Sequence, residues 1–148
     1  MKLNKAISPI LATVILIAVT LVIAIGVIGW IMGIWGSFGA TETLQVYPDS
    51  FINATANTKI LILHVKNTGS ATAVIYRIEI VGLYTATSNF GFSTGFTTST
   101  GTATEVSLTP GQEGYIVVAA GNPIPGTTYQ VKIYTRAGNV FTANVQAK

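Results

Sequence analysis

The fold of this 148-residue chain is decided by residues 7–38, ISPILATVILIAVTLVIAIGVIGWIMGIWGSF. Within the stretch 10–35 the only polar side chains are those of Thr13 and Thr20, and 15 of its 26 residues are Ile, Leu or Val. As a helix this stretch would measure about 39 Å, enough to cross the ~30 Å hydrocarbon core of a bilayer. The apolar part of a cleaved secretory signal is only about 7–15 residues long. The stretch therefore predicts a membrane-spanning helix that the mature protein retains.

The flanks of this run indicate where the helix begins and how it is oriented. Ser8 is a favourable N-cap residue, and Pro9 suits the first helical position, where its missing N–H is not needed. Lys2 and Lys5 precede the run, and no charged residue follows until Glu42. The positive-inside rule then places the amino end in the cytoplasm and residues from about 40 onward outside the membrane.

The beginning of the chain resembles a known family. Residues 5–16, KAISPILATVIL, resemble the class III signal peptide of archaeal type IV pilins, and in particular the adhesive-pilus branch. The resemblance covers about residues 1–36. It implies that the helix, residues 7–38, serves first as a membrane anchor and then as the core of a filament. Bacterial type IV pilins carry a glutamate at the position that is Leu11 here, so the ion pair attributed to that glutamate is not expected.

The resemblance also implies a processing site. In that family a prepilin peptidase cuts on the cytoplasmic side of the apolar run, after a small residue that follows a basic one. Lys5 and Ala6 match this pattern. We therefore expect residues 1–6 to be removed as a leader peptide and Ile7 to become the new N-terminus.

Four glycines are expected to share one face of the helix: Gly26, Gly29, Gly33 and Gly36. A glycine costs about 1 kcal/mol in a helix interior, so a row of four requires an explanation. Small residues let helix backbones approach closely, and Gly29 and Gly33 form a G-x-x-x-G pair. We expect this face to pack against a neighbouring helix, although glycine is also common in membrane helices in general.

From residue 43 onward the sequence alternates with a period of two and is rich in Val, Ile, Tyr and Thr. About seven short strands separated by turn sequences predict an immunoglobulin-like β-sandwich over 39–148, with a barrel as the alternative. In the strand before the last, Tyr129, Val131 and Ile133 would face the interior. The fold class is therefore α+β. The predicted strands lie at 43–48, 59–66, 73–82, 104–108, 113–119, 127–135 and 139–146.

Residues 84–105, YTATSNFGFSTGFTTSTGTATE, interrupt this pattern. The segment is uncharged until its last residue, is rich in Thr, Ser and Gly, and contains Phe90, Phe92 and Phe96. One interpretation is a long hairpin whose phenylalanines tuck onto the sandwich. The other is a surface loop that contacts another subunit or a substrate surface. Because exposed phenylalanines are unfavourable in water, both interpretations require that they be covered in the assembled state.

Composition and charge exclude several function classes. The chain contains no cysteine, which excludes disulfides and thiolate metal sites. Its net charge of +3 includes Lys2 and Lys5, so the remainder is close to neutral. Without a cluster of Lys and Arg residues to neutralise phosphates, we expect no nucleic-acid partner.

Residues suited to catalysis or metal binding are few. The single histidine, His64, lies in an apolar strand pattern, which is typical of a structural residue, and Arg77 and Glu79 are expected to form a solvated ion pair. The acidic residues show no spacing typical of a calcium or zinc site, so we expect no metal, no cofactor and no enzymatic activity. These acids are Glu42, Asp49, Glu79, Glu105 and Glu113.

One modification motif is present. Asn53, Ala54 and Thr55 form an N-glycosylation sequon, and the expected topology places it outside the cell. The sequon predicts a glycan on Asn53 if the chain is exported in an organism that glycosylates its surface proteins.

Together these features predict the major structural subunit of an extracellular archaeal type IV adhesion pilus. Its partners would be copies of itself in a helical filament, the prepilin peptidase and the pilus assembly machinery, with the cytoplasmic membrane holding the precursor. Two alternatives share the same features. One is a minor pilin-like component, and the other is a monomeric, membrane-anchored module that binds at the cell surface.

Overall fold

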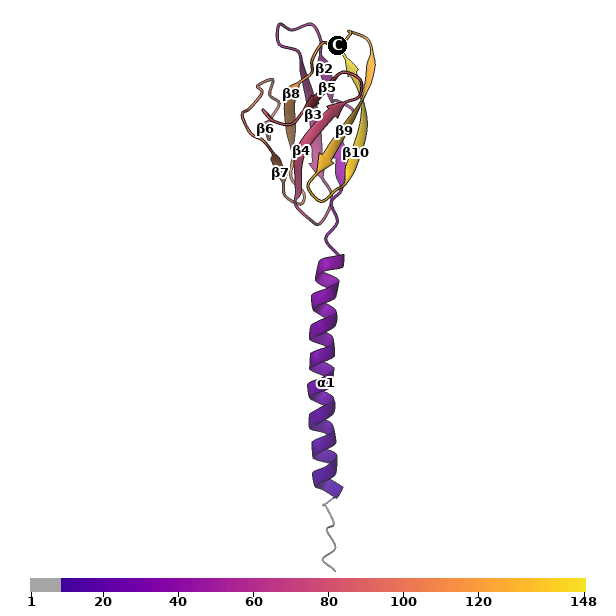
Figure 1. Ribbon diagram of the computed structural model, residues 1–148. Coiled ribbons are helices and arrows are strands. Elements are labelled where there is room, and N and C mark those ends of the chain that lie inside the picture. Colours follow the sequence, from indigo (N-terminus) through magenta and orange to yellow (C-terminus); the bar gives the residue numbers. More distant parts are fainter. Residues whose placement is uncertain (1–8) are drawn as a thin grey trace, which may run out of the picture. The chain divides into compact units, whose positions relative to one another are not determined.

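The computed structural model describes residues 9–148 and, among these, the side chains of all except 36–38. The chain forms two compact units, Met1–Gly39 and Ala40–Lys148. The described part of the first unit contains one helix, and the second contains ten strands (Figure 1). The fold class is therefore α+β, as the sequence predicts.

The helix α1 spans Pro9–Phe38, so it begins at the proline expected at its first position. The expected N-cap residue, Ser8, lies outside the described residues. At the other end, the N–H of Gly39 donates to the carbonyl oxygen of Trp35 at 3.0 Å. No acidic residue occupies the first turn and no basic residue the last, so α1 has no charged side chains to complement its dipole.

The β-domain consists of three-residue strands and strands of seven or eight residues. The seven strands that the sequence predicts are all present, with ends shifted by at most two residues, and three further strands were not predicted. The strands are β1 (Leu44–Val46), β2 (Phe51–Asn53), β3 (Ile60–Asn67), β4 (Ala73–Ile80), β5 (Tyr84–Ala86), β6 (Gly91–Ser93), β7 (Val106–Leu108), β8 (Glu113–Ala119), β9 (Thr128–Thr135) and β10 (Val140–Ala147).

The strands pair in the order β5-β4-β9-β10-β2-β3-β8-β6, with β1 beside β3 and β7 beside β4 (Figure 1). One layer contains β1, β2, β3, β8 and β6, and the other contains β10, β9, β4, β5 and β7. This order matches the two sheets of an immunoglobulin-like sandwich. The layers join where β10 and β2 pair in parallel, Gln146 opposite Phe51. Among the described residues the path does not close on itself, so the arrangement is a sandwich and not a barrel.

The core lies between the two layers and follows the predicted alternation. Val131 and Ile133 on β9 are fully buried, and Tyr129 packs against them from the edge, as expected from the sequence. On the opposite layer, Leu61 and Leu63 of β3 face the same core. Burying a side chain of this size contributes about 1.5–3 kcal/mol, which explains how a domain without disulfides holds together.

A second, smaller apolar cluster lies on the outer face of the layer that contains β3 and β8. Ile60, Ile62 and Val117 are buried there, with Phe51 and Tyr115 packed against them. These residues occupy alternate positions to the main core residues on the same strands, so β3 is apolar on both faces. This explains why β3 reads as a nearly continuous apolar run, ILILHV.

The chain enters the β-domain through a close contact with the loop after β3. Thr41 accepts hydrogen bonds from the N–H groups of Ser70 and Ala71, at 2.9 and 3.1 Å. A Cβ atom on Gly69 would lie 2.2 Å from the carbonyl oxygen of Thr41, so only glycine allows the two backbones to approach this closely. The loop is also held by the buried Asn67, whose Nδ2 donates to the carbonyl oxygens of Ala71 and Leu108 at 2.8 Å each.

The expected ion pair between Arg77 and Glu79 takes a different form. In the described part of the chain the two side chains are joined through Tyr134 and not by a direct ion pair. The guanidinium carbon of Arg77 lies 3.9 Å from the centre of the Tyr134 ring, and the Tyr134 hydroxyl donates to Oε2 of Glu79 at 2.7 Å. The hydrogen bond to Glu79 raises the pKa of the Tyr134 phenol. The aromatic ring therefore separates the two charges that the sequence places on one strand face.

Candidate functional site

The most unusual surface of the chain is the helix. The side chains of α1 are solvent-exposed on every side, including Val22 at 71% and Trp35 at 74%. The segment Pro9–Trp35 is long and apolar enough to cross a membrane, with a mean hydropathy of 3.0. Exposure of so much apolar surface to water would be strongly unfavourable. The helix therefore requires lipid or other protein around its whole circumference.

The two threonines of α1, Thr13 and Thr20, do not disturb its apolar surface. The hydroxyl of Thr13 donates to the carbonyl oxygen of Ile10 at 2.7 Å, and that of Thr20 donates to Ile17 at 2.9 Å. A buried hydroxyl without a partner costs about 1–3 kcal/mol. Because both hydroxyls bond within the helix, neither needs a partner from lipid or a neighbour.

The glycine face is open in the single chain. A Cβ atom added to Gly26, Gly29 or Gly33 would meet nothing within 4 Å, apart from the helix's own nearby backbone. Gly36 lies within α1, but its surroundings fall outside the described side chains. Among the described residues, no contact therefore explains Gly26, Gly29 or Gly33. Packing against a second helix stays a prediction.

The processing site cannot be placed in the structure. Lys5, Ala6 and Ile7 lie outside the described residues, as does the rest of the leader, 1–6. Cleavage after Ala6 stays a prediction.

The three phenylalanines of residues 84–105 have different environments. Phe90 is 1% exposed and belongs to the main core, so its ring is not available to another molecule. Phe92 is half-buried and covers Gly114, where a Cβ atom would lie 2.6 Å from the Phe92 ring. Phe96 is 62% exposed. The interpretation as a segment tucked onto the sandwich therefore fits Phe90 and Phe92, and only Phe96 has a ring exposed enough to serve as a contact residue.

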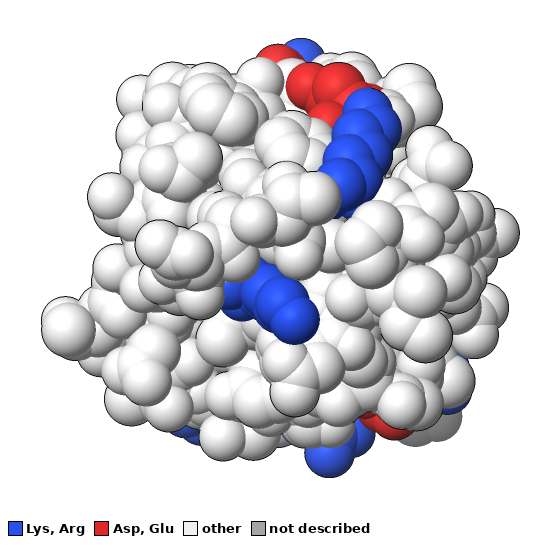
Figure 2. Space-filling model, turned by 90° about the horizontal axis from the view of Figure 1, so that it is seen from above, with Lys and Arg blue, Asp and Glu red and all other residues white. Residues whose placement is uncertain are grey.

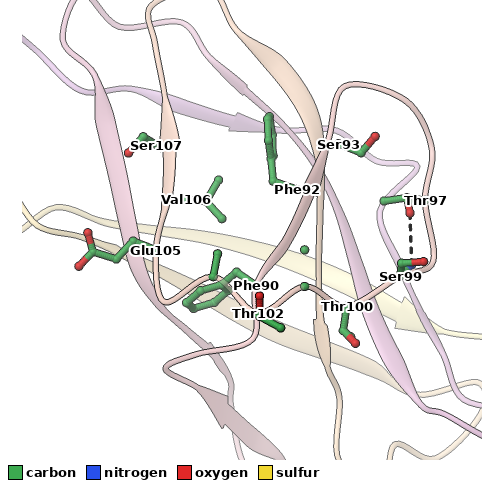
Figure 3. A pocket seen from close by; sticks show the side chains of 13 residues that line it. Phe90, Phe92, Ser93, Thr97, Ser99, Thr100, Thr102, Glu105, Val106 and Ser107 are labelled. Carbon is green, nitrogen blue, oxygen red and sulfur yellow. Dashed lines mark hydrogen bonds between the residues drawn. The ribbon is translucent and has the colours of Figure 1, made fainter.

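The same segment borders a shallow pocket of about 480 Å³ between β6 and β7 (Figure 3). Its walls are mainly hydroxyl-bearing side chains, and the N–H of Ser99 donates to the Thr97 hydroxyl at 3.2 Å. Glu105, the charged residue of this lining, is paired with Arg136, whose Nε donates to Oε1 at 2.7 Å. The pocket thus contains no histidine and no unpaired acid that could act as a general base or nucleophile.

His64 is the centre of a polar cluster that the sequence did not reveal. Its Nδ1 lies 2.8 Å from Oδ2 of Asp49, and its Nε2 lies 3.0 Å from Oε1 of Glu113. Nζ of Lys66 lies 3.2 Å from the other oxygen of Glu113. Hydrogen bonding from Lys66, and secondarily from His64, lowers the pKa of Glu113, and Glu113 in turn raises the pKa of Lys66. The residues are 15 and 49 positions apart from His64, so only the fold brings them together.

Aromatic rings continue from this cluster across the outer face of the layer. The His64 ring lies between Tyr47 and Tyr115, with ring centres 4.4 and 4.3 Å apart. The ring centres of Phe96 and Tyr115 lie 5.6 Å apart in a T-shaped arrangement, and Phe96 stacks on Phe51 with ring centres 6.4 Å apart. Both ring nitrogens of His64 are engaged by carboxylates and both of its faces by rings. The expectation of a structural histidine agrees with this environment.

The glycosylation motif lies at the end of β2, where the turn toward β3 begins. Asn53 is half-buried, and its Oδ1 accepts hydrogen bonds from the N–H of Ala56 at 3.1 Å and the hydroxyl of Thr55 at 3.4 Å. The hydrogen bonds reach the oxygen of the amide, whereas a glycan would be attached to its nitrogen. Occupancy of Asn53 stays a prediction.

Charged side chains are sparse on the face seen in Figure 2, where white residues dominate; one basic side chain lies beside acidic ones toward the upper edge, and another lies near the centre. In residues 9–148, no group of three or more His, Cys, Asp or Glu side chains has an arrangement that could hold a metal ion. This face thus offers few charged groups for contact.

No family model and no curated protein sequence matches the chain. Among solved structures, it resembles the archaellum periplasmic stator protein FlaG from Sulfolobus acidocaldarius with 18% identity and a TM-score of 0.42, over 70% of this chain and 99% of that one. It also resembles a chain of the periplasmic stator complex of FlaF and FlaG from the same organism with 19% identity and a TM-score of 0.40, over 68% of this chain and 86% of that one. Likenesses of this extent assign no function to this chain.

Proposed function

We propose that this protein is the major structural subunit of an extracellular archaeal type IV adhesion pilus, and that it polymerises through α1. The observation that carries the proposal is a helix whose described apolar side chains are largely exposed around its circumference, joined to a β-domain with a buried core of its own. Such a helix suits lipid before assembly and the interior of a filament after it. The resemblance of residues 5–16 to archaeal pilin signal peptides supports the same proposal.

The proposal includes processing and location. The precursor is inserted in the cytoplasmic membrane with its basic end inside, and prepilin peptidase removes residues 1–6. The pilus assembly machinery then transfers the mature chain into the filament, where copies of α1 pack against one another. The β-domain forms the outer surface of the filament and contacts the surface to which the cell adheres.

The test is mass spectrometry of protein sheared from cells that express the full chain. The proposal requires this chain to be the most abundant protein in the sheared filaments and its first residue to be Ile7. A chain found mainly in the membrane fraction would indicate a monomeric, membrane-anchored module. A chain present in filaments only in trace amounts would indicate a minor component.

The processing step has its own test in the same preparation. Lys5→Glu or Ala6→Leu should leave an unprocessed chain in the membrane, because both change the residues that the peptidase is proposed to recognise. Chains in extracellular filaments would contradict the proposal if they began at Met1, which means no cleavage, or at Ala40, which means cleavage after the helix by a signal peptidase.

A further inference from the structure

The glycosylation motif shares one face of β2 with an aromatic ring. Successive residues of a strand point to opposite faces, so residues two positions apart share a face. Ile52 is fully buried in the core, whereas Phe51 and Asn53 on either side of it are half-buried. Phe51 and Asn53 therefore both lie on the outer face of their layer, about 7 Å apart along the strand.

Further rings lie on the same outer face. Phe96 stacks on Phe51 with ring centres 6.4 Å apart, and its ring centre lies 5.6 Å from that of Tyr115. We call Phe51, Phe96 and Tyr115 the aromatic patch. Phe96 is 62% exposed, the largest exposed fraction among the aromatic side chains of the β-domain. The patch thus presents apolar surface to the solvent next to Asn53.

The side chain of Asn53 is held by its oxygen. The N–H of Ala56 donates to Oδ1 at 3.1 Å, and the Thr55 hydroxyl donates to the same atom at 3.4 Å. Both bonds restrict the rotation of the amide, and neither uses Nδ2, the atom through which a sugar would be joined. Attachment of a sugar to Asn53 therefore leaves the hydrogen bonds of this turn intact.

A basic side chain completes the surroundings of Asn53. The backbone of Lys148 brackets this position, because its N–H donates to the carbonyl oxygen of Ile52 and its carbonyl oxygen accepts from the N–H of Ala54, each at 2.8 Å. Its Nζ lies 5.5 Å from the centre of the Phe51 ring. An ammonium group can donate hydrogen bonds to hydroxyl oxygens. Apolar rings and a hydrogen-bond donor thus occur together next to the attachment atom.

This combination suits a sugar. A pyranose ring carries C–H groups on one face and hydroxyl groups around its rim. The faces of aromatic rings have a negative electrostatic potential that attracts the slightly positive C–H hydrogens. A sugar linked to Asn53 is held beside the patch by its covalent bond, so the contact requires no binding from free solution.

We propose that an N-linked oligosaccharide on Asn53 folds back over the aromatic patch and covers the exposed ring of Phe96. The occupant is specified by the chain itself, because the sequon lies two residues from Phe51 on the same strand face. The inference goes beyond the proposed function, since it requires export of the β-domain but no filament. It gives Phe96 a cover within its own subunit.

The first experiment measures occupancy in full-length chains expressed in an archaeal host that N-glycosylates its own surface proteins. Thr55→Ala destroys the sequon, and the matched control Thr55→Ser keeps both the sequon and a hydroxyl. We expect mass spectrometry of proteolytic peptides to find a sugar on Asn53 in the wild type and in Thr55→Ser, and none in Thr55→Ala. An unmodified Asn53 in the wild type would overturn the inference.

The second experiment measures the contact itself. Hydroxyl radicals oxidise aromatic side chains in proportion to their exposure, so the same chains are treated as monomers in detergent and the oxidation of each ring is quantified. We expect Phe96 to be oxidised several-fold less in the wild type and Thr55→Ser than in Thr55→Ala. Tyr76 is the internal reference, because it is 37% exposed and lies on β4 in the other layer.

A second route to the unglycosylated chain guards against an effect of Thr55→Ala on the turn. Asn53→Gln removes the attachment atom's residue and keeps Thr55. Both variants should expose Phe96 to the same extent while leaving Tyr76 unchanged. An increase for Tyr76 as well would mean that the whole domain has loosened and would overturn the assignment of the effect to the sugar.

The outcomes separate the inference from the proposed function. Equal oxidation of Phe96 in glycosylated and unglycosylated monomers would overturn the contact even if Asn53 carries a sugar. Protection of Phe96 that occurs only in sheared filaments, and equally without the sugar, would assign Phe96 to a contact between subunits instead. Because the decisive comparison uses monomers, failure of this chain to form filaments would overturn the proposed function and not this inference.

Discussion

The Nε2 atom of His64 lies 3.0 Å from the Oε1 atom of Glu113, which joins the middle of β3 to the first residue of β8. The contact lies in the same layer as Tyr115, whose ring stacks on His64 at 4.3 Å. Glu113 is also paired with Lys66. The Glu113 carboxylate thus pairs with both His64 and Lys66, so its ionisation should influence how the stability of the domain depends on pH.

We predict that Glu113→Gln reduces the stability of the β-domain at neutral pH. We also expect the stability of the variant to change less than that of the wild type as the pH falls into the acidic range. Lys66 and His64 lower the pKa of Glu113 in the folded state. A lowered pKa stabilises the fold above the unfolded-state pKa, about 4.3, and this contribution is lost as the pH falls through the folded-state value. Thermal unfolding of the full chain in detergent, followed by circular dichroism at neutral and acidic pH, measures the effect. An unchanged acid dependence in the variant would contradict the prediction.

The phenylalanines of the segment 84–105 should differ sharply in their contribution to stability. Phe90→Ala should lower the free energy of unfolding by about 3–5 kcal/mol, because it leaves a cavity in the core. Phe96→Ala should cost less than about 1 kcal/mol, because its ring is largely exposed and only touches Phe51 and Tyr115. Denaturant titration of the two variants compares them directly. Similar losses for both would mean that Phe96 is as important to the core as Phe90.

The glycine face should matter for assembly and not for the single chain. Gly29→Leu and Gly33→Leu meet open space in the isolated helix, and leucine favours membrane insertion. We expect both variants to insert normally but to yield few filaments, because the added side chain separates helices that must pack closely. Ala24→Leu, on the opposite face, is the matched control and should assemble. Membrane fractionation and the yield of sheared filament are the measurements, and normal filaments from both glycine variants would show that the row is incidental.

Filament cohesion should resist salt and yield to detergent. Salt screens exposed charges over about 10 Å at 0.1 M but hardly affects dry contacts between apolar helices. The described part of α1 carries no charge, so molar salt should leave the filaments intact, whereas a detergent that surrounds the helices should dissolve them. Electron microscopy and sedimentation after each treatment provide the test. Dissolution by salt would assign the main cohesion to charged contacts between β-domains.

The parts of the fold that sequence predicts well are those with long, repeated patterns. The start of α1 follows from Pro9, and the long strands follow from their alternation and the turns between them. The strands β2, β5 and β6 were not predicted; each has three residues, but β1 and β7 are equally short and were predicted, so length alone does not explain the difference. β2 exists because β3 and β10 hold it from both sides, which is a property of the tertiary structure.

The candidate surfaces also differ in whether the sequence alone can predict them. An exposed apolar helix and its row of glycines can be identified from composition and spacing alone. The cluster around His64 depends on Asp49 and Glu113, which reach it from distant positions through the pairing of β3 with β8 and the turn before β2. No local pattern in the sequence records this relationship.

The way in which the chain enters the β-domain has a mechanical consequence. Any tension transmitted from α1 reaches the domain at Ala40 and then runs along β1 and β2. These strands are held side-on by β3, and β2 also by the parallel β10, with bonds perpendicular to the strand direction. A pull along the strands loads these bonds in shear, so they share the force instead of opening one after another. A pull directed along these strands would therefore be opposed by several backbone hydrogen bonds at once.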